Sequence, residues 1–86
     1  MRNIAFTPLS IQHITDWGNF DRKIFNKIMS LLQEAAKTPF EGTGKPEALK
    51  HNYQGCWSRR ITQEHRLIYR VSDTTITVIS CKAHYD

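Results

Sequence analysis

The sequence predicts an α+β domain in which two N-terminal helices pack on a largely antiparallel sheet, in the order β-α-α-β-β-β. Apolar residues recur at helical spacing between residues 21 and 37, whereas the last third of the chain alternates apolar and polar residues. Only short turns separate those alternating runs, so the strands they form should be sheet neighbours. With 86 residues, the chain has room for one core, and we expect residues 1–86 to form a single domain.

The first helix is predicted from its start and stop signals. Residues 4–6 form a short apolar strand, and Thr7-Pro8 follows it directly. A threonine hydroxyl caps a helix well, and proline is accommodated at the first helical position because its missing N–H would have no partner there. The pair Gly18-Asn19 should then end this helix.

The second helix, over residues 21–37, carries the clearest pattern in the sequence. Asp21 stands at the positive end of its dipole and Lys37 at the negative end, and both placements are favourable. Thr38-Pro39 should end it. Its apolar residues repeat at intervals of three and four, and we interpret this face as core packing without chemistry: Ile24, Ile28, Leu31, Leu32 and Ala35.

Glycine and proline mark residues 39–55 as a loop, and three strands are predicted after it, over residues 56–61, 66–71 and 75–81. Within the first of them, Arg59 and Arg60 are adjacent. Successive side chains in a strand point to opposite faces, so these two arginines should not line the same groove.

The formal net charge of +4 is unevenly distributed along the chain. Residues 45–82 hold seven basic side chains against three acidic ones, whereas the first 44 residues are nearly balanced. A basic half suggests a polyanionic partner such as nucleic acid, because binding phosphate releases counterions. A solubilising surface is the alternative.

Several classes of protein are disfavoured by composition. No apolar run approaches the ~20 residues of a membrane span, and residues 1–6 do not resemble a signal peptide. The two cysteines, Cys56 and Cys81, lack metal-binding spacing, so we expect buried thiols in the reducing cytoplasm, with neither disulfide nor metal site. We expect no cofactor.

Four residues have the chemistry that RNA cleavage requires. In that reaction the 2′-hydroxyl attacks the neighbouring phosphorus, so a base, a cation and an acid are needed. Glu47, Arg66 and His84 could supply them, with Tyr85 beside the acid, provided that the fold brings them together. A His-Tyr pair at a chain end is otherwise typical of a frayed tail. Since an ordinary glutamate has a pKa of about 4.3, we expect either partial burial that raises the pKa of Glu47 or a rate supplied mainly by orientation of the bound substrate.

Three segments resemble the YoeB/Txe toxins of the RelE superfamily. They are TPFEGTGKPEALKHN at residues 38–52, GCWSRRITQEHRLIY at residues 55–69, and the tail at residues 81–85. The resemblance covers residues 38–85 almost without gaps. The departures are Cys56, at a position where a bulkier residue is expected, and the additional Asp86.

This resemblance implies a RelE-like, microbial-ribonuclease-like fold and a ribosome-dependent endoribonuclease, an mRNA interferase that cuts the A-site codon. It implies that Glu47 is the general base, Arg66 the phosphate-stabilising cation and His84 the general acid, with Tyr85 orienting the RNA or His84. The remaining basic positions implied to contact RNA are Lys45, Lys50, Arg59 and Arg60.

The resemblance also implies partners. Such toxins bind a cognate YefM/Axe-like antitoxin, act on the ribosome and its mRNA in the cytoplasm, and reach operator DNA only through the antitoxin complex; a homodimer is possible. Three alternatives stay open: a non-catalytic RNA or ribosome binder, a ParE-like toxin that poisons topoisomerase, and a plain interaction module.

Overall fold

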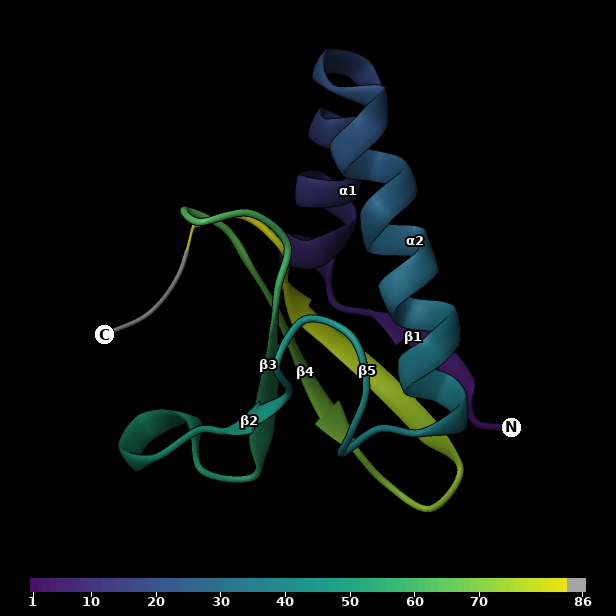
Figure 1. The fold of residues 1–86 in the computed structure, drawn as a ribbon, viewed down its shortest axis with the longest axis vertical. Helices are drawn as coiled ribbons and strands as arrows, with labels where there is room; N and C mark the ends of the chain where they lie inside the picture. Colours follow the sequence, from purple (N-terminus) through teal and green to yellow (C-terminus); the bar gives the residue numbers. More distant parts are fainter. Residues whose placement is uncertain (84–86) are drawn as a thin grey trace.

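The computed structural model describes residues 1–83, which form two helices and a five-stranded sheet (Figure 1). The β-α-α-β-β-β order is confirmed, with one further short strand and a 3-10 helix before the last three strands. The elements are β1 (Asn3–Phe6), α1 (Pro8–Phe20), α2 (Arg22–Lys37), β2 (Glu47–Ala48), the 3-10 helix His51–Tyr53, β3 (Cys56–Arg60), β4 (Arg66–Val71) and β5 (Thr75–Ser80).

The sheet has the order β1-β5-β4-β3-β2 and is mixed. Strand β1 runs parallel to β5, and the other three pairings are antiparallel. The prediction of a largely antiparallel sheet is therefore confirmed. The two helices connect β1, at one edge of the sheet, to β2, at the other edge.

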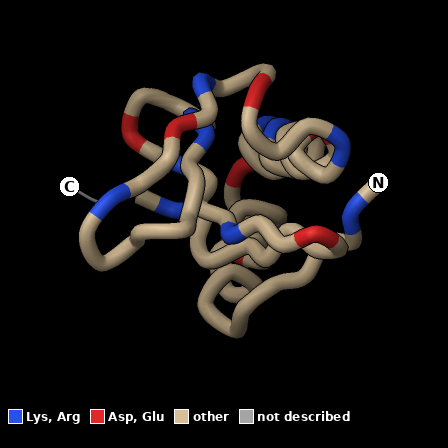
Figure 2. Tube along the Cα trace, turned by 90° about the horizontal axis from the view of Figure 1, so that it is seen from below, with Lys and Arg blue, Asp and Glu red and all other residues tan. Residues whose placement is uncertain are grey.

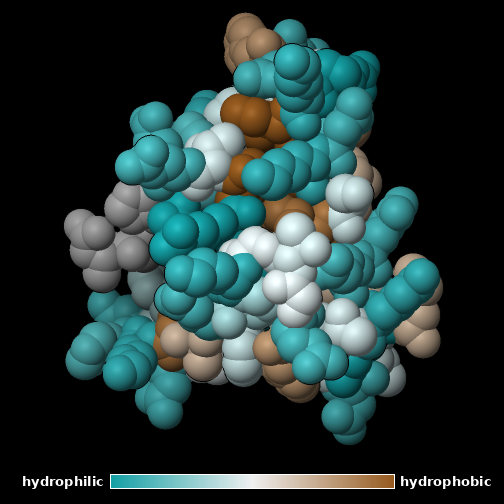
Figure 3. Space-filling model, in the orientation of Figure 1, coloured by the Kyte–Doolittle hydropathy of each residue, from teal (hydrophilic) through white to brown (hydrophobic). Residues whose placement is uncertain are grey.

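Both helices cover the same face of the sheet, as Figure 1 shows. The core lies between that face and the apolar side of α2, where Ile28 and Leu32 are fully buried against Leu67, Tyr69 and Val78 of the strands. This confirms that the apolar pattern of residues 21–37 serves packing. The surface is mostly hydrophilic, with apolar atoms visible around the two helices (Figure 3).

The first helix differs from the prediction at its end. It continues through Gly18 and stops at Phe20, and Asp21 is both its C-cap and the N-cap of α2. The carboxylate of Asp21 accepts hydrogen bonds from the backbone N–H groups of Lys23 and Ile24. Capping by Asp21, rather than the flexibility of glycine, therefore sets the boundary.

Residues 39–55 are not entirely a loop. Glu47–Ala48 pairs with β3 as an edge strand, in the register Glu47 to Ser58. The expected loop is thus wrong at these two residues, and the difference matters because it attaches Glu47 to the sheet. No helix of residues 1–83 is long and apolar enough to cross a membrane.

Candidate active site

The sheet face that points away from the helices carries the charged residues of interest. Glu47 on β2 stands opposite Ser58 on β3, and Ser58 stands opposite Ile68 on β4. Two residues further along the same two strands, Arg60 stands opposite Arg66. Because side chains two residues apart share a face, all five point to one side of the sheet. The fold therefore brings Glu47 and Arg66 to the same face.

Glu47 and Arg66 are two strands apart on that face. With strands about 4.8 Å apart and a rise of about 3.4 Å per residue, their Cα atoms lie roughly 12 Å from each other. Both side chains are long enough to approach a phosphodiester placed between them. Glu47 itself is exposed on the edge strand, so the partial burial expected around it is absent.

Arg60 and Arg66 form a pair of like charges directly across β3 and β4. Residues opposite each other in an antiparallel pair have Cβ atoms about 5 Å apart, and like charges there are unfavourable. Neither guanidinium has an acidic partner among residues 1–83. A bound anion would remove this repulsion, which makes the pair suited to phosphate.

A groove of about 640 Å³ begins at this arginine pair and reaches across to α2. The sequence did not point to its third cation, Lys27, which is on the exposed side of α2. Only the packing of α2 beside the β3–β4 turn reveals it. The groove is lined by Lys27, Arg60, Ile61, Thr62, Gln63 and Arg66. Seen from below, several basic positions lie on the left of the view, and others lie on the helix at the upper right and beside the N-terminus (Figure 2).

Within residues 1–83, the guanidinium of Arg66 is held from one side only. Its Nη1 donates to the carbonyl oxygens of Thr62 at 2.7 Å, Gln63 at 3.1 Å and His65 at 3.1 Å. Its Nε and Nη2 donate to no group within residues 1–83. The β3–β4 turn thus orients the guanidinium and leaves an N–H pair for an oxyanion, the fork geometry that phosphate binding uses.

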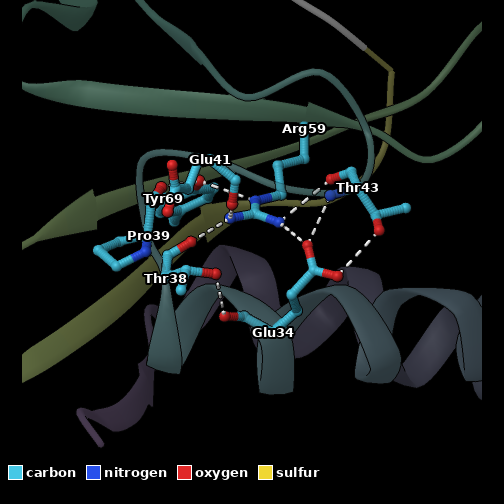
Figure 4. A network of polar contacts seen from close by, with 7 residues as sticks. All are labelled: Glu34, Thr38, Pro39, Glu41, Thr43, Arg59 and Tyr69. Atoms are coloured by element: carbon cyan, nitrogen blue, oxygen red, sulfur yellow. Dashed lines mark hydrogen bonds and ion pairs between the residues drawn. The ribbon is translucent and has the colours of Figure 1, made fainter.

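Arg59 corrects one expectation. Its side chain is fully buried on the helix side of the sheet, so it is not available to contact RNA. Nε donates to the Tyr69 hydroxyl at 3.0 Å, and Nη1 pairs with Glu34 at 2.5 Å. The remaining N–H groups donate to the carbonyl oxygens of Thr38, Glu41 and Thr43 (Figure 4).

The contacts of Arg59 hold the segment that leads to Glu47. Glu34 accepts hydrogen bonds from both the backbone N–H and the hydroxyl of Thr43. The Tyr69 hydroxyl donates to the carbonyl oxygen of Pro39 at 2.6 Å. Hydrogen bonds from Thr43, with further help from Arg59, lower the pKa of Glu34 below its ordinary value. Residues 38–44 are therefore fastened to the core, and Glu47 follows three residues later.

The other predicted residues are distributed as follows. Lys45 and Lys50 are exposed on either side of β2, each near the edge of the sheet that carries Glu47. His84 and Tyr85 lie outside the described residues. Cys56 and Cys81 are buried free thiols, as predicted. Among residues 1–83, no three His, Cys, Asp or Glu side chains gather as metal ligands would.

The fold and this face define a small α+β protein with two opposed arginines on the sheet face away from the helices and a carboxylate at the edge strand. A model of the family described as YoeB-like toxin of bacterial type II toxin-antitoxin system matches residues 6–85. The chain belongs to this family of YoeB-like toxins. The predicted resemblance is confirmed, and it extends into the N-terminal helices.

Individual relatives agree with this assignment. The toxin YoeB of Escherichia coli strain K12 is 52% identical over 69 residues, which cover 80% of this chain and 82% of that toxin. A solved YoeB dimer from Staphylococcus aureus is 44% identical, with a TM-score of 0.91 and 98% of each chain covered. The heterotetrameric YoeB-YefM toxin-antitoxin complex from the same species matches with 43% identity, a TM-score of 0.89 and 99% of each chain covered.

Proposed function

We propose that this toxin is a ribosome-dependent endoribonuclease that cleaves mRNA in the ribosomal A site and thereby inhibits translation. The observation that carries the proposal is the opposed pair Arg60 and Arg66 on the same sheet face as Glu47. A cationic couple that has no acidic partner among residues 1–83, on the same face as a carboxylate, suits a phosphodiester whose charge increases during the reaction. Membership of the YoeB-like family supports the same conclusion.

The reaction is a transesterification within the RNA chain. Glu47 takes the proton of the 2′-hydroxyl, and the 2′-oxygen forms a bond to phosphorus. Arg66 and Arg60 stabilise the additional negative charge on the phosphoryl oxygens. The bond to the 5′-oxygen breaks as His84 donates a proton to it, with Tyr85 orienting the acid or the RNA. The products are a 2′,3′-cyclic phosphate and a 5′-hydroxyl, and these side chains fill every role without a metal ion.

The exposure of Glu47 supports ribosome dependence. An exposed carboxylate is a weak base near neutral pH, so the isolated protein should cleave free RNA slowly. Holding the 2′-hydroxyl and the phosphate in line on the ribosome can supply the missing rate through orientation. Lys27, Lys45 and Lys50 extend the cationic surface beyond the reacting phosphate and would contact mRNA or ribosomal RNA.

We also propose partners on the basis of the relatives. A YefM-like antitoxin should bind this toxin, as in the Staphylococcus aureus complex. The free toxin should form a homodimer, as in the dimer from that species. Operator DNA would be reached only through the antitoxin complex. Since the substrate is mRNA on ribosomes, the activity belongs in the cytoplasm.

The test is a cleavage assay on ribosomes programmed with a defined mRNA. We compare the wild type with Glu47→Gln, Arg66→Ala and His84→Ala, and expect each variant to lower kcat by about 100-fold or more. Lys27→Ala should weaken ribosome binding by about threefold to tenfold. Lys23→Ala, one turn earlier on α2 and outside the groove, is its matched control and should behave like the wild type.

Each other outcome points to a different function. Ribosome binding without cleavage by the wild type would identify a non-catalytic binder. If the wild type neither binds nor cuts, a ParE-like target such as topoisomerase becomes the next candidate. A cleavage rate that is unaffected in Glu47→Gln would remove that residue from the role of base.

A further inference from the structure

The segment after β5 is fastened to the β3–β4 turn at Ala83. The backbone N–H of Ala83 donates to Nδ1 of His65 at 2.7 Å. The carbonyl oxygen of Ala83 accepts from the backbone N–H of Arg66 at 2.9 Å. The adjacent residues His65 and Arg66 therefore bind the N–H and the carbonyl oxygen of Ala83, respectively. Ala83 has a φ of +63°, an uncommon value for a residue with a side chain, and these two bonds stabilise it.

His65 makes further contacts, through its backbone and its ring, that hold the residue in place. Its backbone N–H donates to the Thr62 hydroxyl at 3.1 Å, and its carbonyl oxygen accepts from the N–H of Ile61 at 3.0 Å. Its ring meets Trp17 edge-on, with centroids 4.8 Å apart. In this arrangement Nδ1 serves as the acceptor for the Ala83 amide.

Trp17 contacts both His65 and the segment that follows β5. Its indole Nε1 donates to the carbonyl oxygen of Cys81 at 2.8 Å, two residues before Ala83. Residues 81–83 are therefore bound to both the helical hairpin and the β3–β4 turn. These contacts, rather than strand pairing, hold residues 81–83 after the end of β5.

We propose that His65 is a positioning residue for the cleavage reaction. It holds Ala83, the residue that precedes the proposed general acid His84, while the next residue, Arg66, holds the phosphate. One turn thus sets the starting point of the acid-bearing segment and the orientation of the cation. This inference rests on the proposed function, because it assigns His65 a task in that reaction.

The test compares two substitutions of His65 in the ribosome cleavage assay. Asparagine places Oδ1 close to the position of Nδ1 and can accept the Ala83 N–H, whereas leucine cannot. We expect His65→Leu to lower kcat by about 10- to 100-fold, the effect of a misplaced catalytic group, with little change in KM for ribosomes. His65→Asn should stay within about threefold of the wild type on the same reasoning. Glu64→Gln, an exposed neighbour in the turn, is the control and should not differ from the wild type.

A second measurement follows the Ala83 amide itself by nuclear magnetic resonance. Its proton should exchange slowly in the wild type and in His65→Asn, and about tenfold or more faster in His65→Leu, because the acceptor is lost. This readout does not depend on activity, so it tests the Ala83 contact even if the wild type proves not to cleave RNA. Urea unfolding of all variants shows whether leucine has disturbed the fold as a whole.

Three results would overturn the proposal. The first is a His65→Leu variant that folds and keeps the wild-type kcat. The second is an Ala83 amide whose exchange is the same in all variants. The third is an equal loss of kcat in the asparagine and leucine variants although asparagine keeps the Ala83 amide protected.

Discussion

Arg59 and Arg60 are neighbours in β3 and point to opposite faces of the sheet with opposite consequences. Arg59 is fully buried and donates hydrogen bonds to Glu34, Tyr69 and three backbone carbonyl oxygens. Arg60 is exposed and stands opposite Arg66 in the groove. Of these two adjacent arginines, Arg59 therefore belongs to the core and Arg60 to the candidate active site.

This relationship predicts a separation of stability from activity. Arg59→Ala should lower the free energy of unfolding by about 3–5 kcal/mol, because it removes a buried charge and strands its partners. Arg60→Ala should change that free energy by less than about 0.5 kcal/mol. Instead, it should weaken ribosome binding or cleavage. Urea denaturation and the cleavage assay measure the two effects; equal stability of the two variants would contradict the prediction.

A pair of glycines gives a second test of the segment that leads to Glu47. Gly42 has a φ of +118°, and a Cβ placed there would lie 2.3 Å from Glu34 Oε2, so Gly42→Ala must displace the carboxylate that binds Arg59. We expect it to destabilise the protein by about 1–3 kcal/mol, through strain and lost hydrogen bonds to a charged group.

Gly18→Ala is the matched control for that substitution. Gly18 is inside α1, and an added Cβ would only touch the Phe25 ring at 3.4 Å. Alanine should therefore stabilise the helix by up to about 1 kcal/mol. Thermal unfolding of both variants provides the comparison, and a Gly42→Ala protein as stable as Gly18→Ala would show that the Glu34 contact is unimportant.

The surroundings of His13 predict how the free energy of unfolding depends on pH. Its Nδ1 accepts a hydrogen bond from the Cys81 N–H at 3.1 Å. Burial and then the charge of Lys82 lower its pKa, and Asp16 opposes them in part. The unfolded chain, with a histidine pKa of about 6.5, then binds a proton that the folded protein does not. Stability should therefore fall as the pH decreases from about 6.5 and level off below the folded pKa.

The effect of His13 can be separated from that of Glu34. The pKa of Glu34 is lowered from 4.5, so its contribution to stability is lost only as the pH falls below that value. Urea unfolding between pH 7.5 and pH 5, compared with His13→Asn, isolates the histidine. The variant should show a flatter dependence on pH. If the wild type and the variant decline in parallel, His13 is not the group responsible.

Cys81 should be chemically inert in the folded protein. Burial raises its pKa from 9.0 to about 12, so its thiolate fraction at pH 8 is roughly 1,000-fold lower than that of an unburied thiol. In a Cys56→Ala background, iodoacetamide should label Cys81 only after urea unfolds the protein. Rapid labelling of the native variant would show that the end of β5 opens readily.

Much of the architecture was predictable because it depends on local patterns. The apolar spacing of residues 21–37 and the alternation after residue 56 predicted α2 and the last three strands. The end of α1 was not predictable in this way, because capping by Asp21 competed with the expected break at Gly18. The two-residue strand at Glu47 was missed since it is too short to show alternation.

The sequence by itself determined the fold class, the family and the residue types that RNA cleavage requires. Only the tertiary structure decided which of two adjacent arginines is available, placed Lys27 beside the arginine pair, and brought His65 to Ala83. Those outcomes depend on which face of the sheet the helices cover and on contacts between residues far apart in the chain. A local pattern contains the alternation of side chains, but packing against the helices decides which alternate positions become core and which become surface.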